Sequence, residues 1–502
     1  MIYNNLKYCR VLLLVIGLFF CTEGKADEKE YVVLVGKSVQ SDQSWKKVVD
    51  RLVEIHQAQV VEYNEFTSEA LSRLKGLSPR YVAIVEKPER ISCRFVIDLN
   101  QMSRKVDDDI YCDFLWGIIT GYDAEAALAL VERGRESKEV RSAWCLRNDD
   151  FRDGTYFETM GLYDPKGVWY EKDEDGDTVS RHNFESQSAM VKHMLHWAKV
   201  VGPDMIVYQV EELGNRMLLL PGTKNEEEIV TPREGKLWLG ERHFEPGGQS
   251  RVYFAQVAGA RTYGTRECMP VAWLNDGNVT AFIGSIIFSF YGRGEWGTLK
   301  YWLTDAGRFT LAEAYFLNQQ DMLWHLNEWR PELLHKPCRY NDDPAKMVGA
   351  CYGAYDDFQK KEKENPEVLD KFGHWYERDI WVYYGDPLWN ARVKDLSHDQ
   401  PYTISTRVKG KKCIVTIKIS ADYTWERLCG ELCASYDWMT SLHCAVGNLP
   451  ICYFFPCRLK NPRVSSQQKT GWNITVNKDF LFIRDAYPEA GKTYQVVLDI
   501  DK

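Results

Sequence analysis

Residues 31–63 read YVVLVGKSVQSDQSWKKVVDRLVEIHQAQVVEY, which is typical of a strand, a helix and a second strand in succession. Tyr31–Val35 and Gln59–Tyr63 are apolar runs of strand length. Ser41 and Asp42 are candidate caps for the helix between them. The apolar residues of that helix recur at helical spacing: Trp45, Val48, Val49, Leu52 and Ile55. Strands that alternate with helices predict a parallel sheet with flanking helices.

The same alternation continues along the chain to about residue 395. We expect helices over 67–74, 123–133, 186–200, 267–275 and 298–329, and strands over 81–85, 205–210, 251–257, 279–287 and 379–384. After residue 400 the pattern changes to short alternating strands, over 414–420, 452–455, 480–483 and 494–498. This second pattern is typical of an all-β sandwich.

The N-terminus has the features of a secretory signal. Lys7 and Arg10 precede an apolar run from Val11 to Cys21, and that run is too short to cross a bilayer. Small residues at Gly24 and Ala26 predict cleavage after Ala26. A lipid anchor on Cys21 is the alternative, although the preceding phenylalanines are bulkier than such a site favours. We therefore expect export to the periplasm, the cell surface or the extracellular space.

These patterns divide the chain into four parts. They are a signal peptide over 1–26, an N-terminal α/β subdomain over 27–135, a larger α/β domain over 136–398 and a β-sandwich over 399–502. No later stretch is apolar enough to span a membrane. The hydrophobic content of 45% and the aromatic content of 13% are sufficient for well-packed cores. A formal net charge of −9 argues against nucleic acid as a partner, because phosphate binding needs concentrated Lys and Arg.

Several candidate cofactor and metal sites fail on their spacing. Gly36-Lys37-Ser38 lies where a phosphate loop would, but Tyr31 occupies the position of the required first glycine. The alternating aspartates over 173–177 lack the full calcium-loop pattern. His193 and His196 are three apart on a predicted helix, with no third ligand in view. We therefore predict no cofactor and no metal.

Six of the fourteen cysteines fall in the last quarter of the chain: Cys413, Cys429, Cys433, Cys444, Cys452 and Cys457. In an exported protein such a density predicts disulfides, whose connectivity the sequence leaves open. A zinc site from the same cysteines fits no strong template of ligand spacing.

Three landmarks together resemble the gingipain-type cysteine peptidases. The first is Tyr111-Cys112-Asp113-Phe114 with the acidic helix start at Asp123, and the second is Cys268-Met269-Pro270-Val271-Ala272-Trp273-Leu274 with the strand after it. The third is the helix over 307–320 with the closing Tyr384-Gly385-Asp386-Pro387. The resemblance implies a caspase-like α/β domain followed by a β-sandwich.

The chemistry of that family needs a histidine after one parallel strand and a cysteine after another, so that the imidazole generates a nucleophilic thiolate. Here the segment after the strand at 205 reads QVEELG over 209–214, and the segment after the strand at 251 reads AGAR over 258–261. Neither contains a histidine or a cysteine. The residues expected to form the cleft are Val210, Glu211, Glu212, Gly259, Ala260 and Arg261.

Three functional hypotheses follow. The first is an exported, catalytically degenerate homologue that uses the cleft to bind a protein or peptide. The second is an active cysteine endopeptidase with a relocated dyad, in which Cys268 is the nucleophile and His243 the base. The third is a binding module centred on the β-sandwich. The sequence leaves the ligand and the oligomeric state open.

Overall fold

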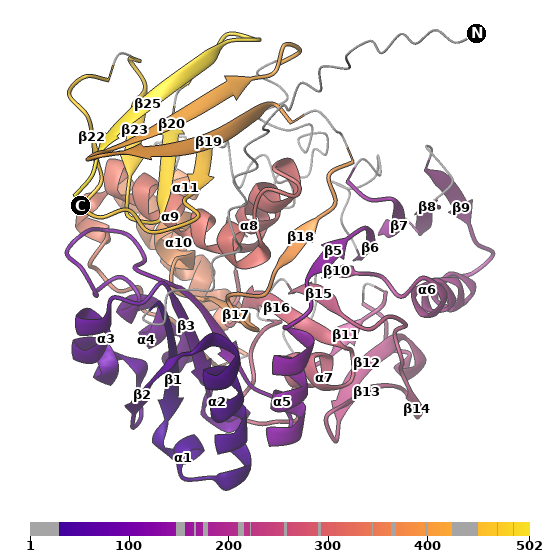
Figure 1. The fold of residues 1–502 in the computed structure, drawn as a ribbon. Helices are drawn as coiled ribbons and strands as arrows, with labels where there is room; N and C mark the ends of the chain where they lie inside the picture. The colour runs from indigo at the N-terminus through magenta and orange to yellow at the C-terminus, as the bar shows by residue number, and fades with distance from the viewer. Residues whose placement is uncertain are drawn as a thin grey trace, which may run out of the picture.

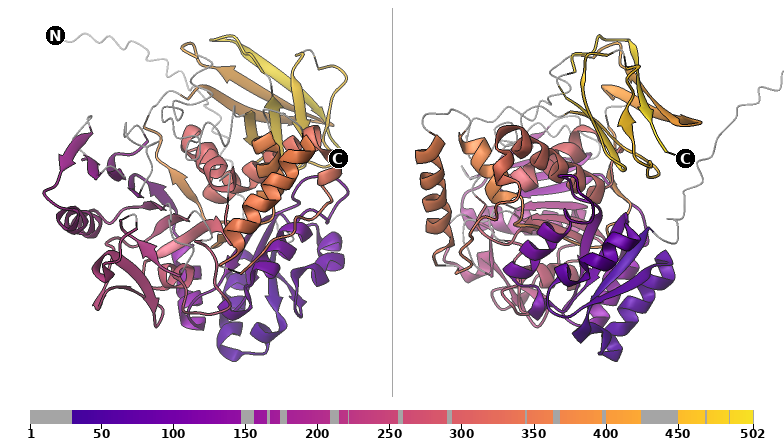
Figure 2. Two further views of the ribbon diagram at one scale, coloured as in Figure 1. Left: turned by 180° about the vertical axis from the view of Figure 1, so that it is seen from behind. Right: turned by 90° about the vertical axis from the view of Figure 1, so that its left-hand side faces the viewer.

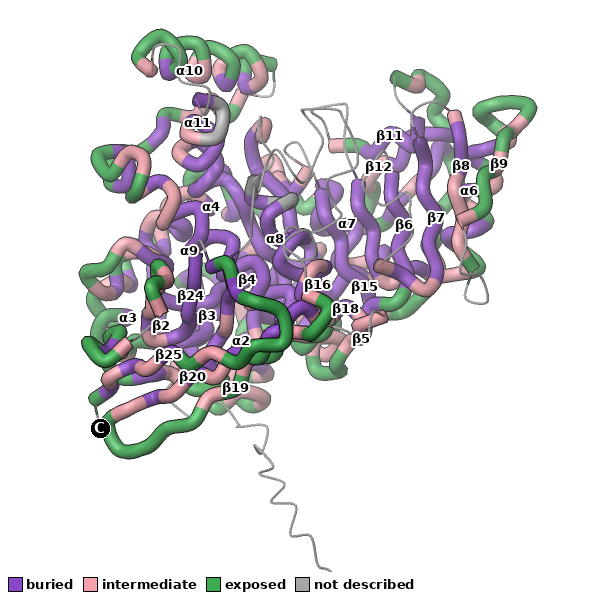
Figure 3. The backbone as a smooth tube through the Cα atoms, turned by 90° about the horizontal axis from the view of Figure 1, so that it is seen from above, coloured by how far each residue is buried: buried purple, intermediate pink, exposed green. Residues whose placement is uncertain are grey.

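A twelve-stranded sheet runs through the centre of the molecule, in the order β2-β1-β3-β4-β17-β16-β15-β10-β6-β7-β8-β9 (Figure 1). The computed structural model describes residues 30–146, 156–164, 167–173, 179–208, 215–220, 222–255, 259–289, 293–343, 345–362, 368–396, 400–423, 450–468, 470–484 and 486–501. The central strands are buried on both faces, whereas helix α10 (Met347–Glu362) is largely exposed (Figure 3).

The first four strands are parallel, as the opening sequence predicts. They are β1 (Tyr31–Gly36), β2 (Gln59–Tyr63), β3 (Tyr81–Val85) and β4 (Leu115–Ile119). Their connections contain α1 (Lys37–Gln40), α2 (Gln43–His56), η1 (Thr67–Ala70), α3 (Leu71–Leu77), η2 (Pro88–Arg90) and α4 (Cys93–Met102), and α5 (Ala124–Arg133) follows β4. The predicted cap of α2 is confirmed at Asp42, whose carboxylate accepts the N–H groups of Ser44 and Trp45.

The other eight strands continue the same sheet. They are β6 (Ser142–Leu146), β7 (Thr159–Asp164), β8 (Val168–Lys172), β9 (Ser180–Asn183), β10 (Met205–Tyr208), β15 (Arg251–Ala255), β16 (Val279–Ser285) and β17 (Trp381–Tyr384). The pairs β7–β8, β8–β9 and β16–β17 are antiparallel, so the sheet is mixed and the expectation of purely parallel pairing is wrong. The segments joining β7, β8 and β9 are too short for the crossover that parallel neighbours require.

Two rows of helices cover the sheet on opposite sides, with α2, α5 and α7 (Met269–Asn275) in one row and α8 (Arg293–Thr304) and α9 (Leu311–Trp329) in the other (Figure 1). The remaining helices are α6 (Gln187–Val201), η5 (Pro331–Leu333) and α11 (Val368–Glu377). The single helical region expected over 298–329 is two helices. Gly307 adopts a φ of +77°, and Thr310 and Glu313 form a capping box that starts α9 anew.

Two small sheets flank the large one. The first contains β11 (Met217–Leu218), β12 (Ile229–Arg233), β13 (Lys236–Leu239) and β14 (Arg242–His243), with η4 (Glu226–Glu228) before β12. The second pairs β5 (Lys138–Val140) with β18 (Ala391–Val393). The predicted segments 27–135 and 136–398 therefore share one large sheet, which continues from β4 to β17 where Ile118 pairs with Tyr384.

The C-terminal strands form two antiparallel sheets. The first contains β19 (Tyr402–Lys409), β20 (Lys412–Ile419), β22 (Arg463–Val464) and β25 (Thr493–Asp499), and the second contains β21 (Ile451–Phe454), β23 (Asn473–Val476) and β24 (Phe480–Arg484). Both sheets contribute to one cluster of buried side chains. The second sheet packs on α9 through Phe316, whose ring lies 6.0 Å from that of Phe454 and 6.1 Å from that of Phe480 (Figure 2). The sandwich arrangement itself stays a prediction.

Candidate functional site

The two strand ends that the sequence places together are neighbours. β10 and β15 are parallel and adjacent, with Tyr208 opposite Ala255, and β16 is the next strand, with Gly284 opposite Ala255. Their carboxyl ends therefore lie at one edge of the sheet, where binding sites of α/β proteins form. The expected cleft residues Val210, Glu211 and Glu212 lie outside the described residues.

The turn after β15 is held closely against β16 and β17. The N–H of Ala260 donates to the carbonyl of Ser285 at 3.1 Å, and the Tyr384 hydroxyl donates to the carbonyl of Ala260 at 3.0 Å. Ala260 is fully buried. A Cβ at Gly284 would lie 2.6 Å from the carbonyl oxygen of Ala255, so this close packing requires glycine there. Ala260 thus acts as a packing residue of this edge.

A small cavity of about 20 Å³ lies beside these strand ends, and we call it the strand-end cavity. It is lined by Tyr208, Arg216, Met217, Tyr253, Ala255, Gly259, Met269, Trp273 and Phe282. The Tyr253 ring stacks on Phe282 and contacts Trp273, each at 4.7 Å between ring centroids. The lining contains no thiol, imidazole or carboxylate among the described residues, so this surface is mainly apolar and aromatic.

The polar groups of this cavity have structural partners. The Tyr208 hydroxyl donates to the carbonyl of Leu218 at 3.0 Å and accepts the N–H of the same residue at 2.7 Å. It therefore fixes β11 against the sheet edge. Arg261, the last of the expected cleft residues, places its guanidinium 4.7 Å from the ring centroid of Tyr263. We read this contact as a cation–π interaction.

Cys268 and His243 occupy different surroundings. Cys268 is fully buried at the N-cap position of α7, one residue before the helix starts, and burial raises the pKa of its thiol to about 12. The Nε2 atom of His243 lies 2.8 Å from a carboxylate oxygen of Asp276, and its Nδ1 atom lies 3.1 Å from one of Glu245. Both ring nitrogens are thus engaged with carboxylates, and neither is directed at the Cys268 thiol.

Sequence analysis missed most of the residues that line the strand-end cavity. Gly259 alone was expected there, whereas Tyr208, Tyr253 and Phe282 lie on strands that were read only as core. Met269 and Trp273 come from α7, and Met217 comes from β11, a strand of two residues. The sequence does contain aromatic residues in three strands that end near this cavity. Their proximity depends on the strand order of the sheet, which a count of residues along the chain does not give.

The described cysteines are free thiols. The disulfides predicted for the C-terminal part are not formed at Cys413, Cys452 or Cys457. Cys413 and Cys452 are buried and pack as small apolar residues. Cys429, Cys433 and Cys444 lie outside the described residues.

The described ranges contain neither a cluster of metal ligands nor a membrane-spanning helix. No group of three or more His, Cys, Asp and Glu side chains is arranged there to hold a metal ion. The His193 ring instead lies 3.0 Å from a carboxylate oxygen of Glu171. No helix in the same ranges combines the length and the hydropathy that crossing a membrane requires.

Comparison with known proteins gives similarity to peptidase structures only. No protein-family model matches the sequence, and no curated protein matches it. The complex of the Porphyromonas gingivalis RgpB pro- and mature domains is 12% identical, with 78% of this chain and 87% of that chain covered and a TM-score of 0.40. The Arg-specific cysteine proteinase gingipain R (RgpB) is 13% identical, with coverages of 79% and 86% and a TM-score of 0.32.

Proposed function

We propose that this chain is an exported, non-catalytic binding protein with a gingipain-like fold, which holds a protein or peptide at the strand-end cavity. One observation carries the proposal. Two adjacent parallel strands end where a catalytic dyad would be assembled, yet the segments 209–214 and 256–261 contain neither histidine nor cysteine. The cleft residues proposed around this cavity are Val210, Glu211, Glu212, Gly259, Ala260 and Arg261.

The chemistry of cysteine peptidases supports this reading. A nucleophilic cysteine must reach the thiolate form and must meet a base that accepts its proton. Cys268 is fully buried with a raised pKa, and both nitrogens of His243 already contact carboxylates. The alternative of a relocated dyad would therefore require both side chains to leave their present surroundings.

The lining of the strand-end cavity favours a ligand with an apolar side chain. Tyr253, Phe282 and Trp273 offer ring faces, and Met269 offers a flexible apolar side chain. Arg216 is the one cation of the described lining. A peptide that packs an apolar side chain against this surface matches its lining, because burial of apolar area provides the affinity.

Exposed apolar side chains in the C-terminal part of the chain favour a second candidate. Val408, Val464 and Tyr487 are exposed, with relative accessibilities of 56%, 37% and 73%. They support the hypothesis of a binding module in this part of the chain. Replacing Tyr487 by Ser, in parallel with Trp273→Phe, distinguishes the two surfaces in any binding measurement.

The test of the proposal is hydrolysis. We expect the purified mature protein to leave casein and short Arg- or Lys-peptide reporters intact, and Cys268→Ala to change nothing. Turnover that survives purification and disappears in Cys268→Ala would establish the relocated dyad instead. N-terminal sequencing of the protein secreted from the full-length gene tests export, and a mature chain that starts at Asp27 is expected.

A further inference from the structure

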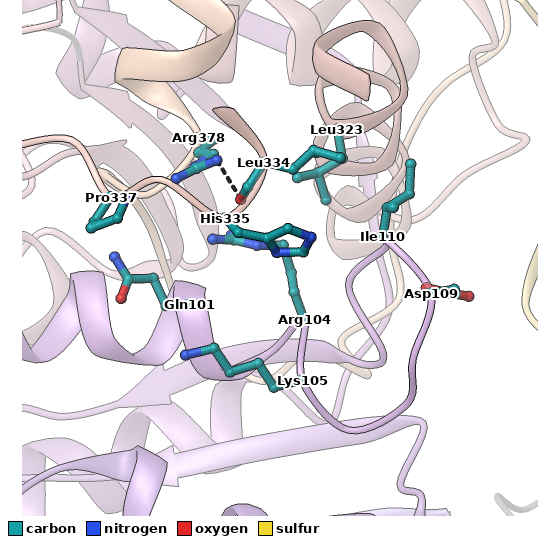
Figure 4. A pocket seen from close by; sticks show the side chains of 10 residues that line it. All are labelled: Gln101, Arg104, Lys105, Asp109, Ile110, Leu323, Leu334, His335, Pro337 and Arg378. Atoms are coloured by element: carbon teal, nitrogen blue, oxygen red, sulfur yellow. Dashed lines mark hydrogen bonds between the residues drawn. The ribbon is translucent and has the colours of Figure 1, made fainter. Parts of the chain in front are cut away.

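A second pocket lies between the end of α4, the loop after it and the segment that follows η5 (Figure 4). Its volume is about 300 Å³. It is lined by Gln101, Arg104, Lys105, Asp109, Ile110, Leu323, Leu334, His335, Pro337 and Arg378. We call it the basic pocket, because three of these side chains are permanent cations.

A buried carboxylate pairs with two of the cations that line the basic pocket. Asp379 accepts hydrogen bonds from Arg104 at 2.6 Å and from Arg378 at 3.3 Å. Burial works against its ionisation, but the two guanidinium groups outweigh burial and lower the pKa of Asp379. Arg378 also donates to the carbonyls of Leu333, Leu334 and Lys336, each at 2.7 Å. Arg378 is therefore a structural residue that fixes one wall.

The pocket retains positive charge after these pairings. Arg104 and Arg378 share the single carboxylate of Asp379. The amine of Lys105 and the imidazole of His335 have no hydrogen-bond or ion-pair partner among the residues that the structure describes, and both residues are exposed. Asp109 contributes one negative charge, and its two oxygens accept hydrogen bonds from the N–H of Tyr111 and from the side chain of Asn477, so Asp109 and Asp379 together offset two of the three permanent cations.

The opposite wall is apolar. Ile110, Leu323, Leu334 and Pro337 contribute hydrocarbon surface beside the cations. Figure 4 shows the His335 ring between Leu334 and the Arg104 side chain, with Lys105 on the near side. The pocket thus combines a cationic side with an apolar side.

We propose that the basic pocket binds a small amphipathic carboxylate, such as the C-terminus of a peptide that ends in an apolar residue. The carboxylate would pair with Lys105 and Arg104, and the apolar side chain would pack on Ile110, Leu323 and Pro337. The three permanent cations and the carboxylates of Asp109 and Asp379 leave one positive charge in excess, which matches a monoanion better than a phosphate dianion. A planar carboxylate also fits the guanidinium fork of Arg104.

The test compares N-acetyl-leucyl-leucine with its C-terminal amide by calorimetry or by NMR titration of the full mature protein. We expect the acid to bind and the amide to bind at least tenfold more weakly, because a charge-assisted hydrogen bond is lost. Lys105→Met should weaken binding of the acid by about tenfold on the same grounds. Lys192→Met, on the exposed side of α6, is the matched control and should leave binding unchanged.

Four results would overturn the proposal. They are equal affinity for the acid and the amide, failure of both to bind at millimolar concentration, full binding by Lys105→Met, and inorganic phosphate binding as tightly as the peptide. His335→Gln gives a second variant at the same wall, and it should also weaken binding of the acid relative to the unmodified protein. Failure here leaves the proposed function at the strand-end cavity untouched, since the two sites share no residue.

Discussion

The strand-end cavity and the basic pocket differ in the polarity and the hydrogen bonding of the side chains that line them. At the strand ends the lining is mainly apolar and aromatic, and the Tyr208 hydroxyl is already bonded to Leu218. In the basic pocket Lys105 and His335 lack partners among the described residues. The strand order therefore determines where the cavity at the sheet edge lies, but not which side chains line it. The two side chains without partners in the described ranges, Lys105 and His335, lie in loops.

The largest expected contrast concerns thiol reactivity. A pKa of about 12 leaves Cys268 with roughly a thousandfold less thiolate near pH 8 than an ordinary cysteine, and burial also limits access. In native protein treated with iodoacetamide, peptide mapping should show Cys457, which is exposed, modified long before Cys268. Early labelling of Cys268 would contradict this prediction and would mean that the strand-end region holds a reactive nucleophile.

Trp273→Ala should produce the largest loss of stability. Trp273 is fully buried and contacts Tyr253 at 4.7 Å, so its truncation leaves a void that enlarges the strand-end cavity. We expect a loss of about 3–5 kcal/mol in the free energy of unfolding, measured by urea denaturation. Val200→Ala, at a side chain with 70% accessibility, is the control and should stay within about 0.5 kcal/mol. A similarly small loss at Trp273 would show that the cavity is loosely packed.

Asp379→Asn tests the floor of the basic pocket. It leaves Arg104 and Arg378 without their shared counter-ion, and removing one partner of a buried pair costs about 3–5 kcal/mol. Because the pKa of Asp379 is lowered in the folded state, its contribution is present above the unfolded value near 4 and is lost as the pH falls. The difference between the two proteins should therefore be large at pH 7 and smaller at pH 3.5. A difference that does not vary with pH would exclude the charge as its cause.

Local patterns in the sequence were sufficient for much of the fold. The strand Gln59–Tyr63 and the strand Tyr81–Val85 have the predicted bounds, and Asp42, Asp123 and Ser186 cap the helices that follow them. These features depend on neighbours within a few residues, which periodicity and capping rules describe. The adjacency of β10 and β15 followed from the resemblance to the gingipain-type peptidases.

Pairing directions and the two cavities depended on contacts between distant segments. The antiparallel pairing of β16 with β17 follows a connection of nearly a hundred residues, and nothing in either strand specifies its partner. Arg104 and Asp379 are 275 residues apart, and the basic pocket gathers side chains from five separate segments. The disulfide prediction used cysteine density and export alone, whereas Cys413 and Cys452 are free thiols on buried strands.

The smallest expected effect on stability distinguishes a lysine in ion pairs from a lysine that has no partner among the described residues. The Lys478 amine lies 2.9 Å from a carboxylate oxygen of Asp107 and 3.3 Å from one of Asp113, whereas the Lys105 amine has no such partner among the described residues. Lys478→Met should cost about 2 kcal/mol, and Lys105→Met should change the free energy of unfolding by less than about 0.5 kcal/mol. Equal losses would mean that Lys105 has a structural role.

The pH dependence of these two variants sharpens the distinction. Burial and the neighbouring Asp107 raise the pKa of Asp113 to about 7, and the charge of Lys478 acts against them. The folded protein therefore binds more protons than the unfolded chain between about pH 4 and 7, and this group makes stability fall as the pH rises. Without Lys478 the pKa of Asp113 rises further, so the deficit of Lys478→Met should be larger at pH 8 than at pH 5. Lys105→Met should show no such trend in urea denaturation at the two pH values, and a parallel trend would place Lys105 in contact with the same carboxylates.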